Sequence, residues 1–291
     1  MILEAKNPDP KTLPTLGVWQ ATHGEKMLTH VSSVFPNVPD FTCDSWCYES
    51  PMDFEGARAL DGGKVELRHR LQDQPHVVYV TTVTPEPEAV VFEARAEVDT
   101  ARDAGGKLPD NLLGPNLCWQ LRRAPGFASK PDPYPEFVKR CFLFTDDGVT
   151  FLDRTERRNI PVRPADHQYN NPPWVQMYIP VWEPLRRSGE GAWADFSSDR
   201  YIYPIIGTVS RDGKYLTAIV CEAPTWALCQ AWHDCMHNNP RWLPDNAPSG
   251  GRTWRLRVYA MENDPEALLK RVGKDFPQAM KLKEKRVPAG E

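Results

Sequence analysis

Alternation of apolar and polar residues with a period of two recurs along the chain and predicts β-strands. The pattern is clear at residues 65–71 and 92–98, where apolar residues alternate with charged ones. His69 interrupts the apolar face of the first segment, and we interpret it as a buried, neutral histidine. Eight more segments are consistent with strands: 76–84, 116–122, 137–145, 149–153, 174–182, 201–210, 215–221 and 253–261.

Two Asp-Gly steps separate neighbouring strand segments and predict tight turns. Asp147-Gly148 lies between two β-rich runs, and Asp212-Gly213 lies between two others. Glycine suits such positions because a tight hairpin turn requires a positive φ. These strands are therefore expected to be antiparallel neighbours.

One helix is predicted, at residues 265–276 near the end of the chain. Asp264 can cap it, Pro265 suits its first position, and Leu268 and Val272 fall on one stripe with Leu269. The sequence therefore predicts an all-β fold of two packed antiparallel sheets, galactose mutarotase-like or jelly-roll-like, with a short C-terminal helix. We expect a single domain over residues 1–291, with flexible ends at about 1–14 and 281–291.

Composition and charge exclude several classes of partner. The 35 basic and 39 acidic residues give a net charge of −4, which offers no basic surface for nucleic acid or an anionic membrane. The chain has no long apolar run and no signal peptide at its start, so we expect a cytoplasmic protein as given, or a secreted one if an export signal was removed. The odd count of seven cysteines favours thiols, although three disulfides remain an alternative. The oligomeric state is not indicated.

The segment 174–182 carries the most informative pattern. One set of alternate positions is purely apolar, which is typical of a core face: Val175, Met177, Ile179 and Val181. The other set is aromatic and polar: Trp174, Gln176, Tyr178 and Trp182. Aromatic rings cover the C–H face of a sugar, while amide and phenol groups bond its hydroxyls, so we interpret this second face as the floor of a carbohydrate-binding cleft. Asn116 and Gln120 would join this floor if their strand neighbours the aromatic one.

Histidines supply candidates for catalysis. His233 and His237 are four residues apart and could hold a metal, but they lack the glutamate of the zinc protease motif. We therefore expect no metal and no cofactor, and interpret His237 as a residue of the cleft in a packed loop spanning residues 226–242.

A basic run leads into the aromatic segment. Arg158 could neutralise the carboxylate of a uronic acid, while His167 and Tyr169 could move a proton from the neighbouring carbon, which is lyase chemistry. The alternative for this run is a solvated loop of paired charges. Hydrolysis would instead require two convergent carboxylates, for which Glu183, Asp195 and Glu222 are candidates.

Three segments near the C-terminus resemble the ends of uncharacterised proteins from environmental bacteria: residues 235–240 (CMHNNP), 248–251 (PSGG) and 262–269 (ENDPEALL). The resemblance covers the last quarter of the chain. It implies a sugar-processing β-sandwich of the galactose mutarotase-like kind, whose members are often exported, and it implies no catalytic residue.

Together these observations predict a carbohydrate-active enzyme, a lyase or hydrolase, whose catalytic candidates are His237, His167, Tyr169 and Arg158. A non-catalytic carbohydrate-binding protein is the first alternative. A cupin-like metalloenzyme using His233 and His237 is the second.

Overall fold

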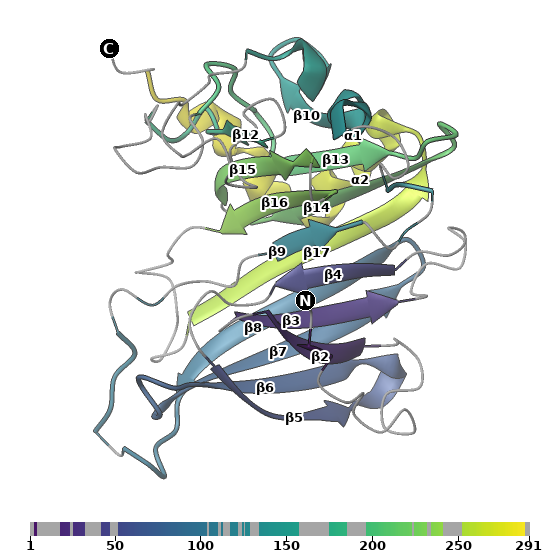
Figure 1. Ribbon diagram of the computed structural model, residues 1–291. Helices are drawn as coiled ribbons and strands as arrows, with labels where there is room; N and C mark the ends of the chain where they lie inside the picture. Colours follow the sequence, from purple (N-terminus) through teal and green to yellow (C-terminus); the bar gives the residue numbers. More distant parts are fainter. Residues whose placement is uncertain are drawn as a thin grey trace, which may run out of the picture.

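The fold is known from a computed structural model (Figure 1). It describes residues 3–4, 18–23, 26–32, 42–46, 52–103, 105–109, 112, 117–121, 124, 126–128, 134–156, 175–184, 196–222, 224–231, 234–240 and 252–288.

Two β-sheets make up most of the described chain. The first has eight strands, in the order β1 (Leu3–Glu4), β2 (Val18–His23), β3 (Lys26–Ser32), β4 (Thr42–Trp46), β9 (Leu117–Gln120), β16 (Cys235–Pro240), β15 (Pro224–Gln230) and β12 (Val175–Tyr178). The second has nine, in the order β11 (Gly148–Phe151), β10 (Cys141–Thr145), β13 (Ile205–Val209), β14 (Tyr215–Cys221), β17 (Arg252–Glu262), β8 (Ala89–Val98), β7 (Val77–Glu86), β6 (Val65–Leu71) and β5 (Met52–Ala59). Neighbouring strands in both sheets pair antiparallel, so the predicted all-β, two-sheet antiparallel sandwich is confirmed.

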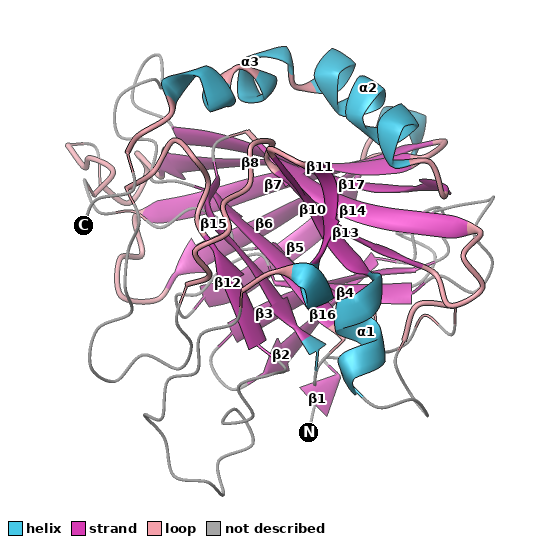
Figure 2. Cartoon of the chain, turned by 90° about the horizontal axis from the view of Figure 1, so that it is seen from above, coloured by secondary structure: helices cyan, strands magenta, loops and turns pink. Residues whose placement is uncertain are grey.

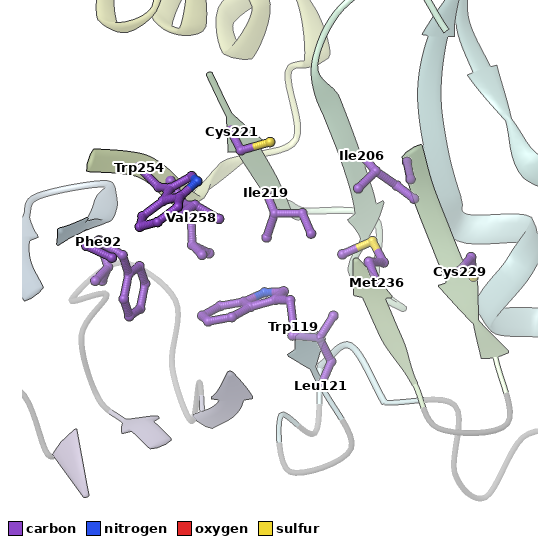
Figure 3. Close-up of a cluster of buried hydrophobic side chains, with 14 of the residues drawn as sticks. Phe92, Trp119, Leu121, Ile206, Ile219, Cys221, Cys229, Met236, Trp254 and Val258 are labelled. Carbon is purple, nitrogen blue, oxygen red and sulfur yellow. The ribbon is translucent and has the colours of Figure 1, made fainter. Parts of the chain in front are cut away.

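The main core lies between the two sheets. Trp119 of β9 and Trp254 of β17 are both almost completely buried in it, and Figure 3 shows their rings in the same cluster. Trp119 Nε1 donates a hydrogen bond to Thr217 Oγ1 of β14 at 3.0 Å, which joins the sheets and satisfies the buried indole. Burial of these aromatic side chains contributes to the hydrophobic stabilisation.

Helices cover the outer face of the nine-stranded sheet, as Figure 2 shows for α2 (Pro265–Asp275) and α3 (Pro277–Met280). Leu268, Val272 and Phe276 are buried against this face in a second core. Asp264 caps α2 by accepting a hydrogen bond from the backbone N–H of Ala267 at 2.9 Å, so the predicted helix and cap are confirmed. No helix in the described ranges is long and apolar enough to cross a bilayer.

Both predicted Asp-Gly turns are present. Gly148 connects β10 to β11 with a φ of 89°, and Gly213 connects β13 to β14 with a φ of 74°. A residue with a Cβ is strained at such angles, which is why glycine at these points marked the hairpins in the sequence.

The strand prediction for residues 137–145 is wrong in its first half. Helix α1 (Tyr134–Arg140) occupies that half, and strand β10 begins at Cys141. Adjacent Phe137 and Val138 are both fully buried in the main core, whereas a half-exposed strand would turn one of them to solvent. Tertiary packing therefore overrides the β propensity of Phe and Val.

The loop interpretation of residues 226–242 is also wrong, because β15 and β16 form a hairpin inside the eight-stranded sheet. Cys, Met, His and Asn are not strong strand formers, so this segment lacks a local β signal. Before the C-terminal segment, the described residues also include two 3₁₀ turns, η1 (Asp61–Gly63) and η2 (Leu152–Arg154).

The C-terminal segment was expected to be flexible from residue 281 onwards. Residues 281–288 instead include a 3₁₀ turn, η6 (Leu282–Lys285), and are held by defined contacts. Arg286 pairs with Asp146 at 2.6 Å, and the backbone N–H of Val287 donates to the carbonyl of Val181 at 2.8 Å. The composition of a polar tail does not reveal such docking.

Candidate functional site

Strand β16 presents different residues to its two faces. Met236 lies in the main core, and the Asn238 amide donates to the carbonyls of Pro204 and Ile219, so both point between the sheets. Because side chains alternate along a strand, Cys235 and His237 lie on the outer face of the eight-stranded sheet. They nevertheless remain buried.

Three polar side chains meet on that outer face, and we call Gln230, Cys235 and His237 the outer-face cluster. Gln230 is directly opposite Cys235 in the β15–β16 register. Its Oε1 accepts a hydrogen bond from Cys235 Sγ at 3.0 Å and lies 2.9 Å from His237 Nε2, and the sulfur and Nε2 are 3.5 Å apart. The amide oxygen thereby fixes the orientation of the imidazole, which is the arrangement a proton-transfer histidine requires.

An apolar group adjoins this cluster on the same sheet. Met177 and Leu228 are buried, and Phe196 and Trp226 pack against them while staying partly exposed. Register places Met177 opposite Leu228 and Leu228 opposite His237. The partly exposed indole of Trp226 therefore lies on the same strand as Gln230 and on the strand next to Cys235 and His237, which is the combination of groups expected for sugar binding.

The backbone register defines a row of paired positions that runs from Cys235 across the eight-stranded sheet. Cys235 is opposite Gln120, Gln120 is opposite Asp44, and Asp44 is opposite His30. The row thus assembles positions more than two hundred residues apart, and nothing in the sequence indicates that they belong together.

The predicted carbohydrate floor on segment 174–182 is not an open surface at Gln176 and Tyr178. Tyr178 is completely buried in the main core, and its hydroxyl lies 2.6 Å from Thr155 Oγ1 and donates to Gln176 Oε1 at 3.1 Å. Gln176 Nε2 in turn donates to the carbonyl of Leu152 at 3.2 Å. The interpretation of the two faces is wrong because β12 turns the face with Gln176 and Tyr178 inwards. The side-chain amide and the hydroxyl form their hydrogen bonds within the protein there.

The other floor residues are placed as follows. Trp182 is half-buried, with its ring edge-on to Tyr201 at 5.6 Å and its Nε1 donating to the carbonyl of Pro224 at 3.2 Å, so it takes part in packing. Strand β9, which carries Gln120, does not neighbour β12, because β16 and β15 lie between them. Trp174 and Asn116 lie outside the described residues.

The remaining catalytic predictions are untested by the structure. His167, Tyr169 and Arg158 all lie outside the described residues, as does the metal candidate His233. Within the described ranges, no group of three His, Cys, Asp or Glu side chains could hold a metal ion. Of the hydrolase candidates, Glu183 is buried and Glu222 pairs with Arg255 at 3.0 Å beside the nine-stranded sheet.

A polar cleft of about 540 Å³ lies elsewhere, where the C-terminal segment docks. Arg200 lines it and donates to the carbonyls of Val287 and Pro180, each at 2.9 Å, and to that of Glu183. Burial lowers the pKa of Arg200, and the nearby positive charge of Arg286 lowers it further. These contacts make Arg200 an anchor for the C-terminal segment.

Arg200→Met is expected to release residues 281–288. The substitution removes three charge-assisted hydrogen bonds to carbonyls, for a loss of about 2 kcal/mol in unfolding free energy. Amide hydrogen exchange of the C-terminal peptide measures the release, and Lys285→Met, at an exposed position in the same segment, is the matched control. Equal protection in both variants would contradict the anchoring role.

Comparisons with known proteins give only distant likenesses. No protein-family model matches the chain, and no curated protein matches it. Among solved structures, the chain is similar to the GH36 alpha-galactosidase AgaA from Geobacillus stearothermophilus, with 9% sequence identity and a TM-score of 0.37 over 84% of this chain. It spans 40% of that protein's length. It is also similar to the Slr1438 protein from Synechocystis sp. PCC 6803, with 10% identity and a TM-score of 0.36 over 91% of this chain and 96% of that one.

Proposed function

We propose that this protein is a carbohydrate-active enzyme that binds a sugar or polysaccharide on the outer face of its eight-stranded sheet. The observation that carries the proposal is the outer-face cluster, in which Gln230 Oε1 lies within 3.0 Å of both Cys235 Sγ and His237 Nε2. Trp226 offers an apolar ring on the neighbouring strand. His237 is the proton-transfer residue in this proposal, in either an elimination or a hydrolysis.

The physical argument concerns orientation. A histidine that acts as a general acid or base depends on a fixed ring position. The hydrogen-bonded contact with Gln230 holds that position. Cys235 lies beside the same imidazole nitrogen, and we assign it a positioning role through Gln230.

Turnover is tested on a panel of neutral and acidic glycans, read for new reducing ends and for the absorbance of an unsaturated product. His237→Gln is expected to lower turnover by about 100-fold to 10,000-fold, which is the usual contribution of a general acid or base. His76→Gln is the matched control and should retain activity, because His76 lies between β6 and β7 of the nine-stranded sheet.

The outcomes separate the three classes of function. Turnover that His237→Gln leaves unchanged would overturn the role of His237. Binding without turnover across the panel would favour a non-catalytic carbohydrate-binding protein. One transition-metal ion per chain, lost in both His233→Ala and His237→Ala, would favour the metalloenzyme.

A further inference from the structure

Two buried thiols face each other across the sandwich. Cys141 begins β10 in the nine-stranded sheet, and Cys229 lies on β15 in the eight-stranded sheet. Their sulfur atoms are 3.8 Å apart, and both side chains are completely buried in the main core. Figure 3 shows Cys229 in this core, at the same end of the cluster as Ile206 and Met236.

The backbone on each side is well fixed. Arg140, which ends α1, donates to the carbonyl of Val209 at 2.7 Å and to that of Phe127 at 2.9 Å, and so anchors the start of β10. Cys229 pairs with Gln176 on one side and with Met236 on the other, so it sits in the interior of its sheet. Neither cysteine can drift far from its partner while the sheets stay packed.

We propose that Cys141 and Cys229 are a site of oxidative modification, where a disulfide forms between the two sheets. A disulfide bond is about 2.05 Å long, so closing the 3.8 Å gap requires each sulfur to move by about 0.9 Å. Rotation of the two side chains can supply a movement of this size. The inference is independent of the proposed function, because neither thiol belongs to the outer-face cluster.

Two further thiols that the structure shows to be buried have different neighbours. Cys221 Sγ donates to Asn238 Oδ1 at 3.5 Å, and Cys235 Sγ donates to Gln230 Oε1 at 3.0 Å. Both contacts are to amide oxygens, which cannot form a disulfide. Among these four buried cysteines, the geometry favours oxidation of Cys141 and Cys229, whose sulfur atoms are in contact.

The reaction with oxidised glutathione balances as a two-step exchange. One protein thiol, as its thiolate, attacks the glutathione disulfide and forms a mixed disulfide, releasing one glutathione thiolate. The second protein thiolate then attacks the protein sulfur of the mixed disulfide and releases the second glutathione. Two electrons pass from the protein thiols to glutathione, and the two thiol protons end on the two reduced glutathione molecules.

The bond is expected to raise the melting temperature of the whole chain. It closes a segment of about 90 residues, and constraining so long a loop restricts the unfolded state strongly. We expect Tm to rise by about 5 °C or more, in line with the effect of long-loop disulfides on a chain of this size.

The experiment uses refolding, because unfolding exposes the buried thiols to the oxidant. The full chain is unfolded in urea with reductant, refolded in a buffer of oxidised and reduced glutathione, alkylated, digested and analysed by mass spectrometry. The expected result is a dominant peptide pair linking Cys141 to Cys229, together with the Tm increase. Cys229→Ala and Cys141→Ala should lose both signals, whereas the matched control Cys221→Ala should keep both.

Recovery of the native fold is checked by circular dichroism before each comparison. If a variant does not refold, incubation of the native wild-type protein with oxidised glutathione gives a second route to the same linked peptide. A natively folded chain in which other cysteine pairs dominate, or in which no pair forms by either route, would overturn the proposal. A linked chain with a lowered Tm would overturn it equally, because the bond would then be incompatible with the sandwich geometry.

Discussion

Tyr178→Ala is expected to lower the unfolding free energy by about 3 to 5 kcal/mol, the usual cost of truncating a buried aromatic side chain. The ring is fully buried in the main core, so its removal leaves a cavity between the sheets. It also leaves Thr155 and Gln176 without their contact to the tyrosine hydroxyl. Urea unfolding followed by tryptophan fluorescence measures the loss.

Tyr178→Phe is the matched control for this prediction. It keeps the ring and removes only the hydroxyl, so we expect a smaller loss of about 1 to 2 kcal/mol from the unsatisfied buried groups. A Tyr178→Ala protein of unchanged stability that no longer binds glycans would reverse this conclusion. It would return Tyr178 to the carbohydrate-binding floor that the sequence pattern suggested.

Acidification is expected to destabilise the protein through His69, by about 2 kcal/mol between pH 7.5 and 5 and by about 3 kcal/mol at pH 4. His69 is completely buried on β6, with its ring 5.3 Å from that of Phe54. Burial lowers its pKa from 6.5 to about 4, although the charge of Glu55 acts weakly in the opposite direction.

The direction of this effect follows from which state binds the proton. Below pH 6.5 the unfolded chain protonates His69, while the folded chain keeps it neutral until about pH 4. The stability that neutral His69 provides is therefore fully present above pH 6.5 and is lost as the pH falls towards 4. Above pH 6.5 this residue adds no pH dependence.

Urea unfolding of wild type and His69→Leu at several pH values tests the prediction. The other histidines and the carboxylates titrate in both proteins, so the difference between the two curves isolates His69. We expect the unfolding free energy of the wild type to fall by about 2 kcal/mol relative to that of His69→Leu as the pH falls from 7.5 to 5. Parallel curves over that range would contradict the prediction, because they would show that the pKa of His69 is the same in the folded and unfolded chains.

Local signals in the sequence were sufficient for much of the sandwich. The strand at residues 65–71 coincides with β6, and the strand at 215–221 coincides with β14. Alternation was readable at residues 65–71 because one face of β6 meets the main core and the other carries charged residues. The cap at Asp264 was readable because capping is decided within one turn of helix.

The candidate site was predictable only in part. His237 was recognised because a histidine beside polar and aromatic residues is a plausible proton carrier, and the structure places it with Gln230 and Cys235. Neither partner was predicted, although the spacing of Cys235 and His237 put them on one face of any strand. The missing information was that residues 235–240 form a strand at all.

Sequence by itself determined that this protein is built from short antiparallel strands with one capped helix, because period, turn residues and caps act over a few residues. Only the tertiary structure decided which face of segment 174–182 is inside. A period of two divides segment 174–182 into two faces, but it does not say which face is buried. The inward direction of Tyr178 depended on how β12 packs against the opposite sheet. The alignment of β9, β15 and β16 that assembles Gln120, Gln230 and Cys235 in one row likewise depends on pairing between distant segments, which no local pattern encodes.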